Sequence, residues 1–249
     1  MPQPTTPSAI TRTTTTMLVS VCCALPLAAL ASAPVCEAKS GALRTPVVEL
    51  YTSEGCSSCP PTDQWLSALK GQPVVAEAFH VAYWDYIGWK DRFAQATFTA
   101  RQRDIAAHNQ LSSIYTPQIV RNGRDWRTSQ PVTESKAAAK ANISIQRVAA
   151  TDGFEARVEP LDANTAWTAY WTVTEDGHSS RVKAGENAGE FLKHDFVVRQ
   201  YTPLGRYQGA QSLQFFALAA DAEHPRHINL VVSDNQSGEP LQALSLACQ

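Results

Sequence analysis

Residues 46–63, PVVELYTSEGCSSCPPTD, place a short apolar run directly before two cysteines that are separated by two serines. The run over 46–52 is rich in β-branched and aromatic side chains, which is typical of a central strand buried on both faces. Apolar residues follow with helical spacing over 63–70, and Gly71 is placed as a C-cap. The sequence therefore predicts a strand, a Cys-Ser-Ser-Cys loop over 56–59 and a helix in direct succession.

This order is the setting that a redox-active dithiol needs. A cysteine at a helix N-terminus faces unpaired N–H groups and the positive end of the helix dipole, which stabilises its thiolate. Cys56 is predicted to be the attacking thiolate and Cys59 the resolving thiol that breaks the mixed disulfide. Two other interpretations stay open: a static disulfide, or half of a zinc site, although the sequence has no second CxxC and no paired histidines to complete four ligands.

The N-terminus has the features of a signal peptide. A stretch rich in Thr and Pro leads into the apolar segment 17–31, and small residues follow it. The apolar segment has about 15 residues, short of the roughly 20 that cross a bilayer. We expect residues 1–33 to form the leader, with cleavage after Ala31 or Ala33, and a secreted or periplasmic mature protein.

Four cysteines remain once Cys22 and Cys23 leave with the leader. An even number of cysteines in an oxidising compartment suggests disulfides. With the 56–59 pair set apart by its spacing, Cys36 and Cys248 are left near the two mature ends. We expect them to form a structural disulfide; the alternative is that both are unpaired in mobile tails.

The rest of the chain divides near residue 150. Before it the sequence predicts a strand over 74–83, a helix over 91–110, a hairpin over 118–127 turning at Asn122-Gly123, and an alanine-rich helix over 134–148. After it come short alternating runs separated by turn residues, at 154–159, 167–174, 191–201, 213–219, 227–233 and 241–247. The predicted fold is an α/β domain over 45–149 followed by a small all-β, sandwich-like domain over 150–249.

Composition excludes several classes of protein. Lys+Arg 21 against Asp+Glu 23 gives a net charge of −2, with no basic cluster of the kind that binds nucleic acid. An apolar fraction of 44% is too high for wholesale disorder. No nucleic-acid partner and no stable membrane insertion after leader cleavage are expected.

Several longer strings resemble the DUF1223 family. They are VVELYTSEGCSSCPPTD, FHVAYWDYIGWKD, FTARQR, YTPQIVRNGR and, nearer the C-terminus, KAGENAGEFLKHDFVVR. The resemblance covers roughly residues 45–249. It implies a secreted protein whose N-terminal domain is thioredoxin-like.

A thioredoxin-like fold implies two further site features. A cis proline faces the dithiol in such folds, and the residue before it docks the partner polypeptide, which assigns substrate binding to Thr116 and Pro117. A buried acid on the strand before the dithiol helps proton transfer, which makes Glu49 a candidate catalytic base. The alternative for Glu49 is an ordinary ion pair with a Lys or Arg.

The sequence thus predicts an exported thiol-disulfide oxidoreductase with Cys56, Cys59 and Glu49 as catalytic residues. Its partner would be a protein carrying thiols or a disulfide, and no resident cofactor or metal is expected. One alternative is a Cu(I)- or metal-handling protein that uses the same cysteines, with His80 as a further ligand. The other alternative is a non-catalytic binding module.

Overall fold

The computed structural model describes residues 1–5, 9, 36–128, 131–148 and 151–248. Residues Pro34–Gln249 form one compact unit, to which the following description applies. The apolar segment of the predicted leader and both candidate cleavage sites lie outside the described residues. In the described ranges, no helix is long and apolar enough to span a membrane.

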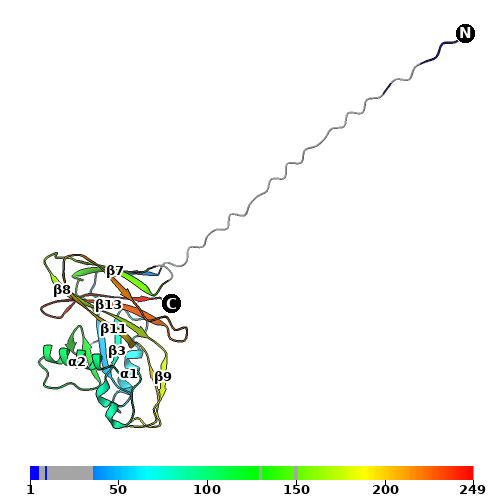
Figure 1. Cartoon of the computed structure of the whole chain (residues 1–249). Helices are drawn as coiled ribbons and strands as arrows, with labels where there is room; N and C mark the ends of the chain where they lie inside the picture. The colour runs from blue at the N-terminus through cyan, green and yellow to red at the C-terminus, as the bar shows by residue number, and fades with distance from the viewer. Residues whose placement is uncertain (6–8, 10–35, 129–130, 149–150, 249) are drawn as a thin grey trace. The chain divides into compact units, whose positions relative to one another are not determined.

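Strands dominate the compact unit, and its helices are few (Figure 1). The strand and helix around the cysteines are β2, Val47–Thr52, and α1, Pro60–Ser67. The elements that follow are β3 (Val75–His80), the 3-10 helix η1 (Ala82–Ile87), α2 (Ala96–His108), β4 (Gln118–Arg121) and β5 (Arg124–Asp125). All of them were anticipated from sequence except η1, which occupies the aromatic segment after β3.

The other strands are β1 (Glu37–Lys39), β6 (Ala141–Arg147), β7 (Gly153–Pro160), β8 (Ala166–Glu175), β9 (His178–Arg181), β10 (Phe191–His194), β11 (Val197–Gln208), β12 (Gln211–Phe216), β13 (Arg226–Asp234) and β14 (Pro240–Ala247). They form three sheets with the earlier strands. β9 and β10 make a separate two-stranded ribbon, with residues 182–190 as the loop between them.

The largest sheet joins both halves of the chain. Its eight strands run in the order β14-β13-β8-β11-β3-β2-β4-β5. β11 pairs with β3 in parallel, through Val197 and Ala78, and β3 pairs with β2 in parallel, while the remaining pairs are antiparallel.

The predicted fold class, a thioredoxin-like α/β domain followed by a small all-β domain, is therefore wrong. The protein is mostly β, and strands from both sides of residue 150 share one mixed sheet. β6 and β7 even pair with each other across that point. β11 and β3 are far apart in sequence, and no local sequence pattern predicts that they pair.

Another correction concerns residues 134–148, which were predicted to be helical. Part of this segment is the strand β6, whose side chains alternate between buried and exposed. Ile143 and Ile145 face the core, and Asn142 and Gln146 face solvent. The preceding alanines suggested a helix, but the period-two alternation after them decided the structure.

The two helices lie on opposite faces of the β2–β3 part of the sheet. Val48 and Leu50 of β2 pack against Leu66 of α1. Tyr51 of β2 packs instead with Phe98 of α2. Because successive strand residues point to opposite faces, the two clusters define an α1 face and an α2 face.

A four-stranded sheet, β1-β6-β7-β12, covers the other part of the large sheet. Its buried side chains share one apolar cluster with those of β8, β13 and β14. Cys36, just before β1, and Cys248, just after β14, form a disulfide with their Cα atoms 6.1 Å apart. The start and end of the compact unit are thus joined covalently.

Candidate functional site

The Cys56–Cys59 loop connects the carboxyl end of β2 to the first turn of α1. The two cysteines form a disulfide, with their Cα atoms 5.4 Å apart. Cys59 is the N-cap residue of α1, and the carbonyl of Cys56 accepts a hydrogen bond from the Cys59 N–H. Pro60 and Pro61 open the helix, where their missing N–H groups cost nothing. The local sequence thus fixes the disulfide at the helix start.

Both sulfur-bearing residues are buried, although the two serines between them are exposed. Cys56 is 1% exposed and Cys59 0%. The β9–β10 loop contacts this segment: the Asn187 side chain donates to the carbonyls of Glu54 and Cys56, and the Ser57 N–H donates to the Glu186 carboxylate. The loop therefore holds the disulfide segment in place through backbone contacts.

η1 also packs against the disulfide loop and links it to Thr116. A Cβ added to Gly55 would lie 3.0 Å from the Trp84 Cβ, so the loop and η1 touch closely. The Trp84 indole N–H donates to Thr116 Oγ1 at 2.8 Å. The Thr116-Pro117 peptide bond is cis. The Trp84 side chain therefore connects the disulfide loop to Thr116.

Glu49 lies elsewhere, on the α2 face of β2. Arg101 of α2 donates to both of its carboxylate oxygens at 2.9 Å, and the Tyr51 hydroxyl donates to it at 2.7 Å. The structure therefore shows the alternative interpretation of Glu49, an ion pair with an arginine. This ion pair lies on the sheet face opposite α1. Glu49 has no part in the function proposed below.

A cluster of buried acids and imidazoles lies on the α1 side of the disulfide loop. One donor atom each of Asp63, His80 and His194 lies within 4.8 Å of the other two. Glu54 and Asp91 flank them: His194 Nε2 is 3.3 Å from Glu54 Oε1, and His80 Nδ1 is 2.7 Å from Asp91 Oδ2. All five residues are at most 7% exposed.

The electrostatics of the cluster depend on its histidines. Burial lowers the pKa of His194, but the carboxylates of Asp63 and Glu54 outweigh burial and raise it to about 9. Burial raises the pKa of Asp91, but His80 and two backbone N–H groups overcome this effect and leave the pKa below its usual range. Burial raises the pKa of Glu54 as well, but the interactions of this carboxylate with His194, Ser180 and Trp89 outweigh burial, and its pKa is likewise lowered.

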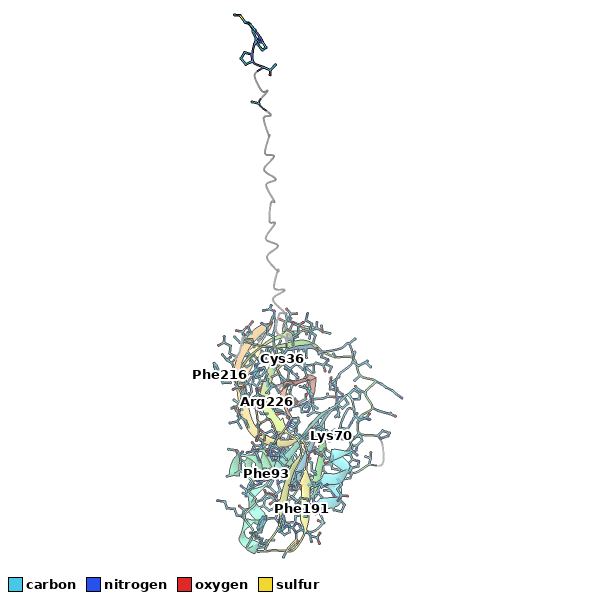
Figure 2. All side chains as sticks on the ribbon, turned by 90° about the vertical axis from the view of Figure 1, so that its right-hand side faces the viewer. Cys36, Lys70, Phe93, Phe191, Phe216 and Arg226 are labelled. Carbon is cyan, nitrogen blue, oxygen red and sulfur yellow. A yellow bond between two sulfur atoms is a disulfide. The ribbon has the colours of Figure 1, made fainter. Side chains whose placement is uncertain are left out.

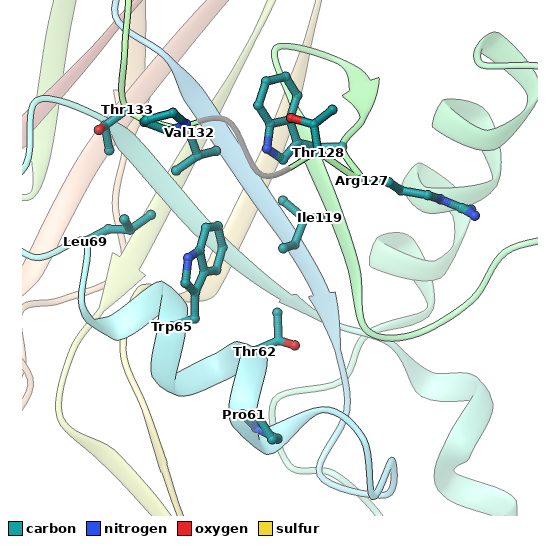
Figure 3. Close-up of a pocket in the computed structure, with 11 residues that line it drawn as sticks. Pro61, Thr62, Trp65, Leu69, Ile119, Arg127, Thr128, Val132 and Thr133 are labelled. Atoms are coloured by element: carbon teal, nitrogen blue, oxygen red, sulfur yellow. The ribbon is translucent and has the colours of Figure 1, made fainter.

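An open groove of about 650 Å³ runs along α1, starting two residues beyond Cys59. Figure 3 shows Pro61, Thr62 and Trp65 of α1 on one side of it. Ile119 of β4 and Val132 contribute the other walls. The groove therefore lies beside the helix that begins at the disulfide.

Comparison with known proteins assigns the family. The family model described as "Protein of unknown function (DUF1223)" matches residues 47–233, which include the disulfide loop and the acid–imidazole cluster. The chain belongs to the DUF1223 family. A comparison with curated proteins gave no match.

Two solved structures resemble this DUF1223 chain. The crystal structure of protein AGR_C_4864 from Agrobacterium tumefaciens has a TM-score of 0.59 at 22% identity, covering 84% of this chain and 96% of that one. HBP35 of Porphyromonas gingivalis has a TM-score of 0.54 at 12% identity, covering 82% of this chain and 75% of that one. These likenesses concern the fold alone.

Sequence reasoning missed most of the cluster in this DUF1223 chain. Sequence reasoning considered His80 as a metal ligand together with the two cysteines. It did not single out Glu54, Asp63, Asp91 or His194. His194 comes from β10, far along the chain, and no ligand spacing connects it to His80. The one local signal was that Glu54 and Asp63 bracket the cysteine pair.

Proposed function

We propose that the protein is an exported thiol-disulfide oxidoreductase that acts through the Cys56–Cys59 pair. The observation that carries the proposal is the pairing of these cysteines at the start of α1. In the reduced state, the positive end of the α1 dipole favours a thiolate at this place. The Cys36–Cys248 disulfide supports an oxidising compartment and therefore export.

The reaction is a two-electron exchange with a protein substrate. The reduced Cys56 thiolate attacks one sulfur of a substrate disulfide, and the other substrate sulfur leaves as a thiolate. Cys59 then loses its proton and attacks Cys56 Sγ, which releases the second substrate thiol and forms the Cys56–Cys59 disulfide. A substrate dithiol would drive the same steps in reverse.

Access to the sulfurs requires the β9–β10 loop to move. Ser57 and Ser58 are already exposed, whereas Cys56 is covered. Glu186 and Asn187 are held by three hydrogen bonds to the backbone of residues 54–57. Each such bond contributes about 1 kcal/mol, so the free energy of substrate binding can offset the cost of opening the loop.

Trapping of mixed disulfides tests the proposal. In a Cys59→Ser variant, Cys56 lacks its resolving partner. Mixed disulfides with proteins of the compartment that receives the exported protein should therefore accumulate and appear on non-reducing gels. A Cys56→Ser variant that retains Cys59 is the matched control and should trap far less. Absence of trapping in both variants contradicts the proposal.

The reduction potential gives an independent measurement. We expect the Cys56–Cys59 couple, equilibrated against glutathione buffers, to lie above about −300 mV, since structural disulfides lie below that value. A potential below it, together with absent trapping, would identify a structural bond. The measured value also fixes whether the pair oxidises or reduces its substrates.

A further inference from the structure

The acid–imidazole cluster beside the disulfide loop has features that the proposed thiol chemistry does not use. Asp63 comes from α1, His80 from the end of β3 and His194 from the end of β10. Their donor atoms converge within 4.8 Å although the residues are remote in sequence. The rings of both histidines contact Phe93, which Figure 2 shows in the half of the compact unit away from Cys36.

His80 has one nitrogen fixed and the other without a partner. Asp91 Oδ2 lies 2.7 Å from His80 Nδ1 and also accepts the Glu54 N–H. A carboxylate only accepts hydrogen bonds, so Nδ1 carries a proton, and in the neutral imidazole Nε2 then presents a lone pair. His80 is 0% exposed, and its Nε2 makes no hydrogen bond within the described ranges. A carboxylate behind one imidazole nitrogen is the usual support of a metal-binding histidine.

His194 repeats this arrangement with another acid behind it. Its Nε2 faces Glu54 Oε1 at 3.3 Å, and its Nδ1 faces Asp63 Oδ1 at 3.8 Å. Neither nitrogen reaches hydrogen-bond geometry with a described residue. Glu54 is anchored through its other oxygen by the Trp89 indole N–H at 2.7 Å. The Glu54 carboxylate thus lies at ion-pair distance behind Nε2, while Nδ1 faces Asp63.

Asp63 completes the set with one oxygen. Its Oδ2 accepts the Thr52 hydroxyl at 2.8 Å, which leaves Oδ1 toward His194. Tetrahedral Zn²⁺ with bonds of about 2.1 Å holds its donors roughly 3.4 Å apart. Small side-chain rotations would therefore bring these three donors into coordination.

Charge also favours a cation here. Glu54, Asp63 and Asp91 are three buried carboxylates, and across the described ranges their ion pairs are with the two histidines alone. Buried charges need compensation or coordination. A divalent ion would offset two of these three negative charges and give the free nitrogens a partner.

We propose that Asp63 Oδ1, His80 Nε2 and His194 Nδ1 bind one Zn²⁺. Two imidazoles and one carboxylate form a borderline donor set that suits zinc, and a water molecule would fill the fourth position. Asp91 and Glu54 are positioning residues, each holding one histidine. The cysteines are not ligands, which separates this site from the cysteine-based metal alternative and from the thiol chemistry.

Zinc binding to the exported, disulfide-bonded protein tests the site. After chelator treatment and dialysis, titration with Zn²⁺ should give one ion per chain by elemental analysis and raise Tm. Asp63→Asn, which conserves volume, and His194→Gln should each abolish stoichiometric binding. Asp91→Asn should weaken it by about 10- to 100-fold, as expected for a residue that supports a ligand.

Two matched variants should bind zinc like the unmodified protein: Cys56→Ser/Cys59→Ser, and His108→Gln, which removes an exposed imidazole on α2. Binding that is absent from the unmodified protein, lost with the cysteines or unaffected by Asp63→Asn and His194→Gln would overturn the proposal. Co²⁺ provides a check without substitution: the protein should show tetrahedral d–d bands and no thiolate charge-transfer band. The trapping experiment is independent of every one of these outcomes.

Discussion

Glu77 of β3 is a fully buried carboxylate whose charged form the fold disfavours. It is 0% exposed and accepts hydrogen bonds from the hydroxyls of Thr172 at 2.5 Å and Tyr170 at 2.9 Å. Burial, followed by repulsion from Glu49, raises its pKa to about 7. The hydroxyl hydrogen bonds and Arg101 oppose these effects without cancelling them.

This shift predicts the pH dependence of stability. Between the ordinary pKa of 4.5 and about 7, folded Glu77 keeps a proton that the unfolded chain loses. Its stabilising contribution is full below pH 4.5 and disappears as the pH rises through about 7. Between those limits, the free energy of unfolding should fall by about 3 kcal/mol on account of this residue.

Glu77→Gln should remove that part of the pH dependence and make the variant more stable than the unmodified protein above pH 7. Urea unfolding at a series of pH values measures the effect. Glu190→Gln, at an exposed position, is the control and should leave the curve unchanged. Parallel curves for Glu77→Gln and the unmodified protein would contradict the assignment.

At the residue scale, sequence reasoning found what was local. The cysteine pair and Thr116-Pro117 each lie within a few residues of a recognisable pattern, and Cys36 with Cys248 followed from their number and place. Asp63 and His194 carried no such pattern, because their proximity depends on the ribbon β9–β10 crossing near α1. The cluster was missed because long-range strand pairing, which the sequence does not reveal, brings its residues together.

At the element scale, the β4–β5 hairpin shows a local prediction that succeeded. Asn122 and Gly123 have φ values of 51° and 76°, as a two-residue type I′ turn requires. Asn122 Oδ1 also accepts the Val47 N–H, which ties the turn to the start of β2. Turn chemistry is read from two adjacent residues, so sequence was sufficient here. The helix predicted where β6 lies was wrong, because the helix propensity of alanine is a weak guide where alternating burial of side chains favours a strand.

Gly123→Ala should destabilise this hairpin. The added Cβ would lie 3.2 Å from the Gly238 carbonyl oxygen, and the left-handed conformation costs an L-residue roughly 1–2 kcal/mol. We expect a loss of that size in the free energy of unfolding by urea denaturation. Gly205→Ala is the control, since its Cβ would point into open space, and should change stability by less than about 0.5 kcal/mol. Equal effects of the two substitutions would refute this account.

At the scale of the whole molecule, the sheet that joins both halves was beyond sequence reasoning. Most strands after residue 150 were recognised, but β9 was not predicted, and the predicted strand 191–201 is β10 followed by the start of β11. The assignment of these strands to a separate domain also missed the pairing of β11 with β3. Period-two alternation shows that a strand has a buried face and says nothing about which strand lies beside it. Tertiary pairing decided the architecture.

The two disulfides should differ greatly in their contribution to stability. Cys36 and Cys248 are separated by 212 positions and Cys56 and Cys59 by 3. Because a bond restricts the unfolded chain more as the loop lengthens, Cys36→Ser/Cys248→Ser should lower the free energy of unfolding by about 2–5 kcal/mol. Cys56→Ser/Cys59→Ser should cost clearly less. Urea denaturation compares them, and a larger loss for the short loop would reverse this ranking.

The covalent closure between Cys36 and Cys248 also imposes an order of events during biosynthesis. Cys36 emerges from the ribosome before the other three cysteines of the compact unit, and Cys248 emerges last. Until Cys248 has been synthesised, the compact unit offers Cys36 only Cys56 and Cys59 as partners, and both would be wrong. Early formation of the Cys56–Cys59 bond would remove these competitors. The pair to which we assign thiol-disulfide exchange would then also favour correct formation of the Cys36–Cys248 disulfide.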